Sequence, residues 1–174
     1  MCIRDRPIEI RRDGLELRVR PTAHYAEFWK RVAADTWEPQ TFRVLREHLS
    51  PSETLLDIGA WIGPTALYGA HFAGRVIALE PDPVATEELR GNLALNPAVD
   101  VRVEVIPASL ATSDTSVTLF CGGFHHNAES TLGDSMTSLL PSSSASSQQE
   151  VEVEGICIET LEARCDMGLS LIHI

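Results

Sequence analysis

The sequence is poor in positive charge. Its 174 residues include 14 lysines and arginines against 25 aspartates and glutamates, which gives a formal net charge of -11. A protein that binds nucleic acid needs a basic surface to meet the phosphate backbone. We therefore expect no nucleic-acid partner.

Signals for a membrane, for secretion and for metal binding are also missing. No apolar run approaches the roughly 20 residues that cross a bilayer, and the N-terminus is polar and charged, unlike a secretory signal. The four cysteines form no C-x-x-C pair, which argues against a zinc site or a disulfide framework. We interpret the pair His125-His126 as part of a solvated loop. These absences predict a cytoplasmic protein with no membrane partner and no metal.

The two ends of the chain are related at the level of codons. Residues 1–6 can be encoded by DNA whose reverse complement encodes residues 169–174. The shared sequence resembles a transposon-end adapter used in sequencing libraries. We expect both segments to be adapter-derived and the gene to be cut at both ends, so that the chain is a fragment.

The hydrophobic pattern predicts an α/β fold. The nearly apolar run at 54–58 is typical of a parallel strand covered on both faces, and further strands are expected at 76–79 and 101–106. Helices are expected at 64–72 and at 82–95, where Asp82 can cap the first turn and Pro83 can occupy its first position. Strands that alternate with helices favour a parallel sheet.

Other elements are expected on both sides of this sheet. Alternating residues around Asp13-Gly14 predict a hairpin, and helical spacing predicts helices at 25–32 and from Pro39. Antiparallel strands are expected at 116–121 and 150–158, with a long polar segment at 122–149 between them and a helix from Thr160. We expect residues 7–50 to form an N-terminal extension and residues 51–168 to form a partial domain.

The most informative segment is a glycine-containing turn that follows the first parallel strand. It reads Asp57-Ile58-Gly59-Ala60-Trp61-Ile62-Gly63, and Glu80 ends the next strand. Glycine tolerates positive φ and lets a ligand approach the backbone, and the start of the following helix offers N–H groups to a carboxylate or phosphate. An acid placed like Glu80 can accept hydrogen bonds from both ribose hydroxyls. The pattern predicts a nucleoside-cofactor pocket.

Two classes of cofactor use such a turn. The dinucleotide fingerprint is G-x-G-x-x-G, and Trp61 occupies the position of its second glycine, where a pyrophosphate must approach closely. The fit to NAD is therefore poor. The spacing D-x-G-x-x-x-G is similar to motif I of class I S-adenosylmethionine methyltransferases. Trp61 itself could stack on a ligand or pack over the turn.

A more specific resemblance extends beyond the turn. Residues 56–68 and 76–83, with Leu89, Asn92, Leu93 and Asn96, resemble the FkbM family of methyltransferases, as do residues 37–42 and 151–161. The resemblance implies a Rossmann-like class I methyltransferase sheet, here incomplete, with an inserted antiparallel strand pair. It also implies S-adenosyl-L-methionine as cofactor and the hydroxyl of a sugar or polyketide-type metabolite as methyl acceptor.

The resemblance also implies site residues. Asp57 would lie near the methionine end of the cofactor, the backbone of Gly59, Ala60 and Gly63 would line it, and Glu80 would bind the ribose. Ala108-Ser109 would border the adenine, and Glu38 would reach the methionine amino group.

One part of the family pattern has no counterpart in this sequence. Family members continue into a fourth strand with a lysine-and-acid motif that helps build the active site, so no catalytic base is assigned here. An NAD(P)-dependent oxidoreductase fragment and a catalytically inactive module stay open as alternatives.

Overall fold

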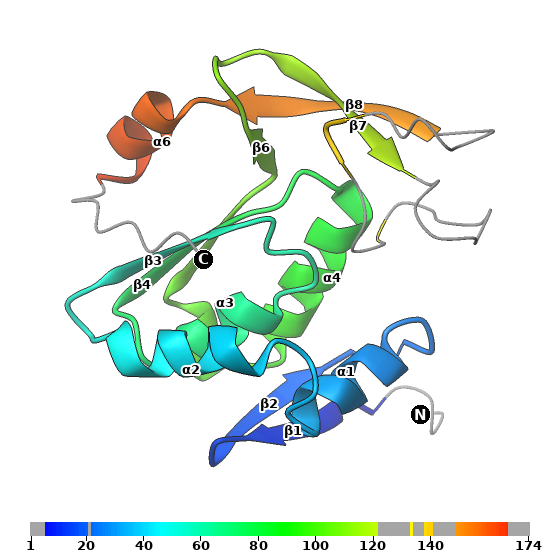
Figure 1. Cartoon of the computed structure of the whole chain (residues 1–174), viewed down its shortest axis with the longest axis vertical. Coiled ribbons are helices and arrows are strands. Elements are labelled where there is room, and N and C mark those ends of the chain that lie inside the picture. The colour runs from blue at the N-terminus through cyan, green and yellow to red at the C-terminus, as the bar shows by residue number, and fades with distance from the viewer. Residues whose placement is uncertain (1–5, 21, 122–132, 134–137, 141–148, 167–174) are drawn as a thin grey trace.

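The computed structural model describes residues 6–20, 22–121, 133, 138–140 and 149–166 (Figure 1). Its central feature is a parallel sheet of three strands, β3 (Thr54–Ile58), β4 (Arg75–Leu79) and β5 (Val103–Ile106), in the order β3-β4-β5. Helix α3 (Pro64–Gly69) connects β3 to β4, and α4 (Pro83–Ala94) with the short α5 (Pro97–Asp100) connects β4 to β5. This confirms the predicted α/β fold with Rossmann-like crossovers.

The central strand is β4, in which residues 76–79 are all buried, as expected for a strand covered on both faces. The side chain of Asp82 caps α4 by accepting the N–H groups of Val84 and Ala85, at 2.8 and 3.1 Å, as the sequence predicted. The third strand begins at Val103 rather than at residue 101, because the unpredicted α5 takes up the residues after Pro97.

The N-terminal extension consists of a hairpin and two helices. Strands β1 (Ile8–Arg12) and β2 (Leu15–Val19) pair across a turn in which Asp13 and Gly14 both have positive φ, 51° and 80°. Positive φ at both central residues matches the twist of a two-residue hairpin. Helices α1 (Ala26–Ala33) and α2 (Pro39–His48) follow, and α1 lies beside the hairpin (Figure 1).

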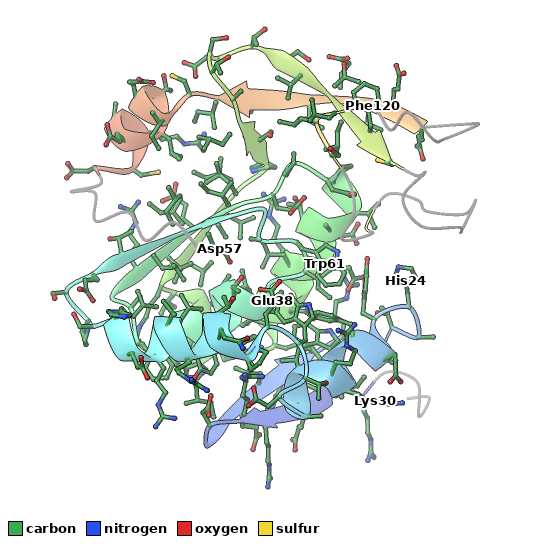
Figure 2. All side chains as sticks on the ribbon, viewed as in Figure 1. His24, Lys30, Glu38, Asp57, Trp61 and Phe120 are labelled. Atoms are coloured by element: carbon green, nitrogen blue, oxygen red, sulfur yellow. The ribbon has the colours of Figure 1, made fainter. Side chains whose placement is uncertain are left out.

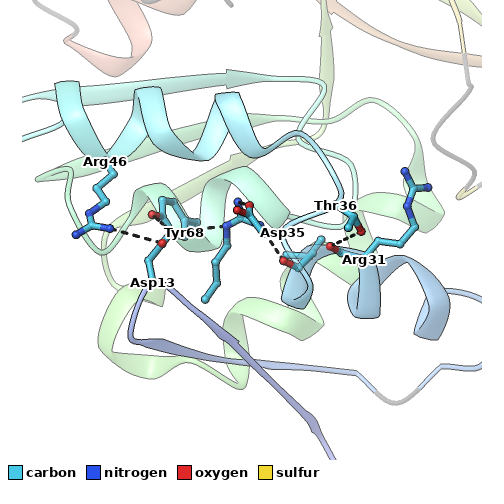
Figure 3. A network of polar contacts seen from close by, with 8 residues as sticks. Asp13, Arg31, Asp35, Thr36, Arg46 and Tyr68 are labelled. Atoms are coloured by element: carbon cyan, nitrogen blue, oxygen red, sulfur yellow. Dashed lines mark hydrogen bonds and ion pairs between the residues drawn. The ribbon is translucent and has the colours of Figure 1, made fainter.

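The hairpin is tied to the rest of the fold through its turn (Figure 3). Tyr68 of α3 donates its hydroxyl to Asp13 at 2.7 Å, and Arg46 of α2 forms an ion pair with Asp13 at 3.5 Å. The neighbouring Arg12 is buried with its guanidinium 3.9 Å from the centroid of the Phe42 ring. One apolar core contains residues of the hairpin, of α1 and α2 and of the parallel sheet.

A second small sheet lies beside the first. It has the order β6-β8-β7, formed by β6 (Ala108–Leu110), β7 (Ser116–Cys121) and β8 (Gln149–Ile156). The antiparallel pairing of β7 with β8 was predicted, whereas β6, which runs parallel to β8, was not. Helix α6 (Ile158–Cys165) follows. An apolar cluster that includes Ile77, Ile106 and Ile156 joins this sheet to the parallel one.

Several segments singled out in the sequence lie outside the described residues. They are residues 1–5 and 169–174, His125, His126 and most of the polar segment at 122–149. Among the helices that the structure describes, none is long and apolar enough to cross a bilayer.

Candidate functional site

The glycine-containing turn leaves the carboxyl end of β3 and enters α3. Three of its residues adopt left-handed backbone, with φ of 75° at Gly59, 49° at Trp61 and 94° at Gly63. The N–H groups of Gly59 and Ala60 both donate to the carbonyl of Leu79 at 2.9 Å, which fixes the turn against β4.

The two glycines are needed for different reasons. A Cβ atom at Gly63 would lie 2.5 Å from Leu89 Cδ1, so Gly63 allows α4 to pack closely against the turn. A Cβ atom at Gly59 would meet no atom within 4 Å. The backbone of Gly59 therefore borders open space, as is expected where a ligand approaches.

Asp57 lies beside the start of the helix that follows the turn. Its Oδ2 atom accepts the Thr65 hydroxyl at 2.6 Å. Burial, with a smaller contribution from the charge of Glu38, raises the pKa of Asp57 to about 6.

The start of α3 offers fewer N–H donors than an ordinary helix start, because Pro64 has no N–H group. The carboxylate of Asp57 lies close to this helix start through its hydrogen bond with Thr65.

Glu80 follows β4 and is 4% exposed. Its two carboxylate oxygens each accept a backbone N–H, from Asp82 at 2.8 Å and from Trp61 at 2.7 Å. Burial raises the pKa of Glu80 to about 7, against the opposing effect of these two hydrogen bonds. The charges of Asp82 and Asp57 raise it further. Each carboxylate oxygen keeps a lone pair that a further donor can use.

Two pockets lie on either side of the turn. The larger has a volume of about 720 Å³ and the smaller of about 270 Å³. Four residues line both, so the pockets adjoin: Ile58, Gly59, Trp61 and Leu110.

The predicted site residues are divided between the two pockets. Asp57, Ala60 and Glu38 line the larger pocket with Gly59, while Glu80, Ala108 and Ser109 line the smaller pocket with Gly59. Gly63 lines neither and contributes through its packing. Figure 2 shows Glu38, Asp57 and Trp61 in the same central part of the molecule, although Glu38 lies nearly twenty positions before the segment that holds Asp57 and Trp61.

Aromatic side chains of the N-terminal extension complete the larger pocket, which the sequence did not indicate. Phe28 and Trp37 line it, and Phe28 contacts Trp61 edge to face with 4.5 Å between ring centroids. The indole of Trp61 donates its Nε1–H to the carbonyl of Gly133 at 2.8 Å. Trp61 thus packs over the turn, and it also borders both pockets.

Comparisons with known proteins give similarity to solved structures alone. No family model matches the sequence, and no curated protein matches it. Similar structures include Trm5b from Pyrococcus abyssi (24% identity, TM-score 0.39), the tRNA (uracil-54, C5)-methyltransferase from the same organism in complex with S-adenosyl-L-homocysteine (24%, 0.38), and methyltransferase FkbM from Methylobacillus flagellatus KT (20%, 0.38).

These similarities cover part of each chain. The match to Trm5b covers 59% of this chain and 28% of that protein, and the match to the tRNA (uracil-54, C5)-methyltransferase covers 59% and 24%. The match to FkbM covers 55% of this chain and 31% of that protein.

Proposed function

We propose that this chain contains the cofactor-binding part of an S-adenosylmethionine-dependent methyltransferase. The observation that carries the proposal is the pair of adjoining pockets around the turn, with the carboxylate of Glu80 in the smaller and that of Asp57 in the larger. Residues 51–168 would form the cofactor-binding domain, and residues 7–50 the extension that closes one side of it.

The smaller pocket suits an adenosine group. Glu80 is held by two backbone N–H groups and would accept the ribose hydroxyls with its remaining lone pairs. Pro81, Ala108 and Leu119 supply apolar walls for a flat base, and Ser109 supplies a polar atom. The open space beside Gly59 lets the nucleoside lie against the backbone.

The larger pocket suits the methionine part of the same cofactor. Asp57 and Glu38 place negative charge where the cofactor would bring an ammonium group and a sulfonium. Ala60 lines this pocket, and Gly63 keeps the turn close to α4. When bound, S-adenosylmethionine would supply a methyl group activated by the positive sulfur.

The remaining space of the larger pocket would take the methyl acceptor. Phe28 and Trp37 offer apolar area, and Arg31 and Thr41 offer polar atoms. We propose a small molecule with a hydroxyl group, such as a sugar or a secondary metabolite, in a cytoplasmic enzyme. The contribution of these residues to rate would be positioning, since methyl transfer needs the acceptor oxygen in line with the sulfur–methyl bond. No residue is assigned as base.

An NAD(P)-dependent oxidoreductase is the less favoured alternative. A dinucleotide needs free N–H groups for its pyrophosphate at the start of the helix after the turn. In this chain the first residue of that helix is Pro64, which has no N–H group, and the carboxylate of Asp57 lies beside it through its bond with the Thr65 hydroxyl. The Trp61 side chain also stands where the fingerprint needs a glycine.

A nucleic-acid acceptor is the competing substrate class, since the similar structures include tRNA methyltransferases. The net charge of -11 speaks against it, because affinity for a phosphate backbone depends largely on a basic surface. The choice between these classes rests on this charge.

Calorimetric titration tests the proposal. We expect S-adenosylhomocysteine to bind the chain and NAD to bind at least tenfold more weakly. The substitutions Asp57→Asn and Glu80→Gln should each weaken the binding of S-adenosylhomocysteine. Glu152→Gln is the matched control, because Glu152 lies on the exposed face of β8 away from both pockets. Tighter binding of NAD, or no binding of S-adenosylhomocysteine, would refute the proposal.

A further inference from the structure

Four hydrogen bonds near the turn form a closed ring. Both oxygens of Glu80 accept backbone N–H groups, one from Trp61 at 2.7 Å and one from Asp82 at 2.8 Å. Asp82 in turn accepts the N–H of Gly133 at 2.6 Å, and Gly133 accepts the indole N–H of Trp61 at 2.8 Å. The ring therefore begins and ends at Trp61.

The position of Gly133 in this ring is closely defined. Its carbonyl also accepts the hydroxyl of Tyr25 at 2.9 Å. Its φ is 92°, and a Cβ atom there would lie 2.6 Å from the Tyr25 hydroxyl oxygen and 2.8 Å from Val84 Cγ1. Only glycine fits this conformation and this space without displacement.

Trp61 is held at an unfavourable backbone conformation. A φ of 49° is uncommon for a large side chain. The indole of Trp61 contacts the aromatic rings of Phe28 and Tyr25 edge to face, at centroid distances of 4.5 and 5.6 Å. These contacts and the bond to Gly133 hold the side chain, and the backbone N–H of the same residue points at Glu80.

We propose that Trp61 is a positioning residue, which fixes the Glu80 carboxylate for the ribose hydroxyls by bonding a glycine 72 positions later in the chain. The cofactor affinity then depends on the indole N–H of Trp61, although no hydrogen bond from that N–H to the ligand is invoked. The inference rests on the proposed function for the identity of the ligand, whereas the ring of hydrogen bonds stands without it.

A simpler reading gives Trp61 no role beyond its backbone shape. In that reading the turn needs a left-handed residue at position 61, and glycine would serve better than tryptophan. The two readings differ in what they predict for Trp61→Gly.

The first experiment titrates S-adenosylhomocysteine into the wild type and three variants. Trp61→Phe keeps an aromatic side chain but loses the hydrogen bond to Gly133, and we expect the affinity for S-adenosylhomocysteine to fall about threefold to tenfold. Trp61→Gly should fall at least as far. Tyr68→Phe is the matched control, since it also removes one aromatic donor, here to Asp13 of the hairpin, and should bind like the wild type. Wild-type affinity in either Trp61 variant would overturn the proposal.

The second experiment asks whether the effect passes through Glu80. With the 2′,3′-dideoxy analogue of S-adenosylhomocysteine, the hydrogen bonds from ribose to Glu80 are not made. The affinity of Trp61→Phe for this analogue should then be less than twofold below that of the wild type. An unchanged cost would show that Trp61 acts by another route.

The third experiment uses the contact between Trp61 and Gly133. Gly133→Ala should weaken the binding of S-adenosylhomocysteine about as much as Trp61→Phe. The added Cβ atom would clash with Tyr25 and Val84, so we expect residue 133 to move and its bond with Trp61 to be lost. The variant that combines Trp61→Phe with Gly133→Ala should bind S-adenosylhomocysteine as tightly as the weaker-binding single variant, since both substitutions remove the same hydrogen bond. Additive losses would contradict a shared bond.

A measurement without ligand separates this inference from the proposed function. The indole N–H of Trp61, assigned in the NMR spectrum by its loss in Trp61→Phe, should exchange slowly with solvent and should exchange faster in Gly133→Ala. Fast exchange of this N–H in the wild type would contradict the closed ring of hydrogen bonds, even if S-adenosylhomocysteine binds. Slow exchange in a wild type that binds no S-adenosylhomocysteine would support the ring and refute the proposed function.

Discussion

The protonation of Glu80 should affect stability and cofactor binding in opposite directions. The perturbation is Glu80→Gln, which removes the charge and keeps the size of the side chain. The comparison is made from pH 4.5 to pH 8, because burial raises the pKa of Glu80 from its ordinary value of 4.5 to about 7 in the folded chain.

The magnitude follows from the difference between the folded and unfolded pKa. Between pH 4.5 and about 7 the folded state holds a proton on Glu80 that the unfolded state has lost, so the free energy of unfolding falls as pH rises. Each pKa unit corresponds to about 1.4 kcal/mol, which gives about 3 kcal/mol over this window. The stabilisation is fully present below pH 4.5 and is lost as pH passes through about 7.

Cofactor binding should show the opposite trend. The ribose hydroxyls donate hydrogen bonds, and an ionised carboxylate accepts them more strongly than a protonated one. The affinity for S-adenosylhomocysteine should therefore fall as the pH drops below about 7. Glu80→Gln should bind weakly at every pH in the window.

Urea unfolding and calorimetric titration, each at several pH values, measure the two trends. We expect the free energy of unfolding of Glu80→Gln, minus that of the wild type, to rise by about 3 kcal/mol from pH 4.5 to pH 8. Subtraction removes the contribution of other groups such as Asp57, which titrate in both proteins. A difference that stays constant over this range would refute the reasoning about Glu80.

Three further predictions concern stability, each measured by urea unfolding at pH 7. Asp82→Ala should lower the free energy of unfolding by about 2 kcal/mol, because the side chain accepts three backbone N–H groups; a loss below about 0.5 kcal/mol would contradict its role as a cap. Tyr68→Phe should cost about 1 kcal/mol through the lost bond to Asp13, and the cost should vanish in an Asp13→Ala background. Thr65→Val should cost about 1 kcal/mol and raise the pKa of Asp57, since the threonine hydroxyl lowers that pKa; an Asp57 titration that shifts to lower pH would be inconsistent with this bond.

Much of the fold follows from local signals in the sequence. The start of α4 is predictable because Asp82 and Pro83 are a strong cap and first residue. The hairpin turn is predictable because an Asp-Gly pair readily takes positive φ at both positions. Strand β4 is predictable because a strand buried on both faces is apolar throughout.

The unpredicted parts depend on contacts between distant segments. Strand β6 has three residues and no alternation of its own, and it exists because Ala108 to Leu110 pair with β8 more than forty positions later. Phe28 and Trp37 have the spacing of ordinary core residues, so nothing in the sequence indicates that they line a pocket. Gly133 stands in a polar segment, and its role depends on three side chains that reach it from elsewhere.

Trp61 connects the predictable and the unpredictable parts of the site. The sequence shows that it occupies the place of a glycine in the dinucleotide fingerprint, and the structure shows that its backbone does adopt the left-handed conformation. Such a conformation costs of order 1–2 kcal/mol for a residue with a Cβ atom. Aromatic contacts with the N-terminal extension and the hydrogen bond to Gly133 can offset this cost. The shape of the turn in this chain therefore depends on residues outside the turn, and a short motif cannot by itself specify the pocket.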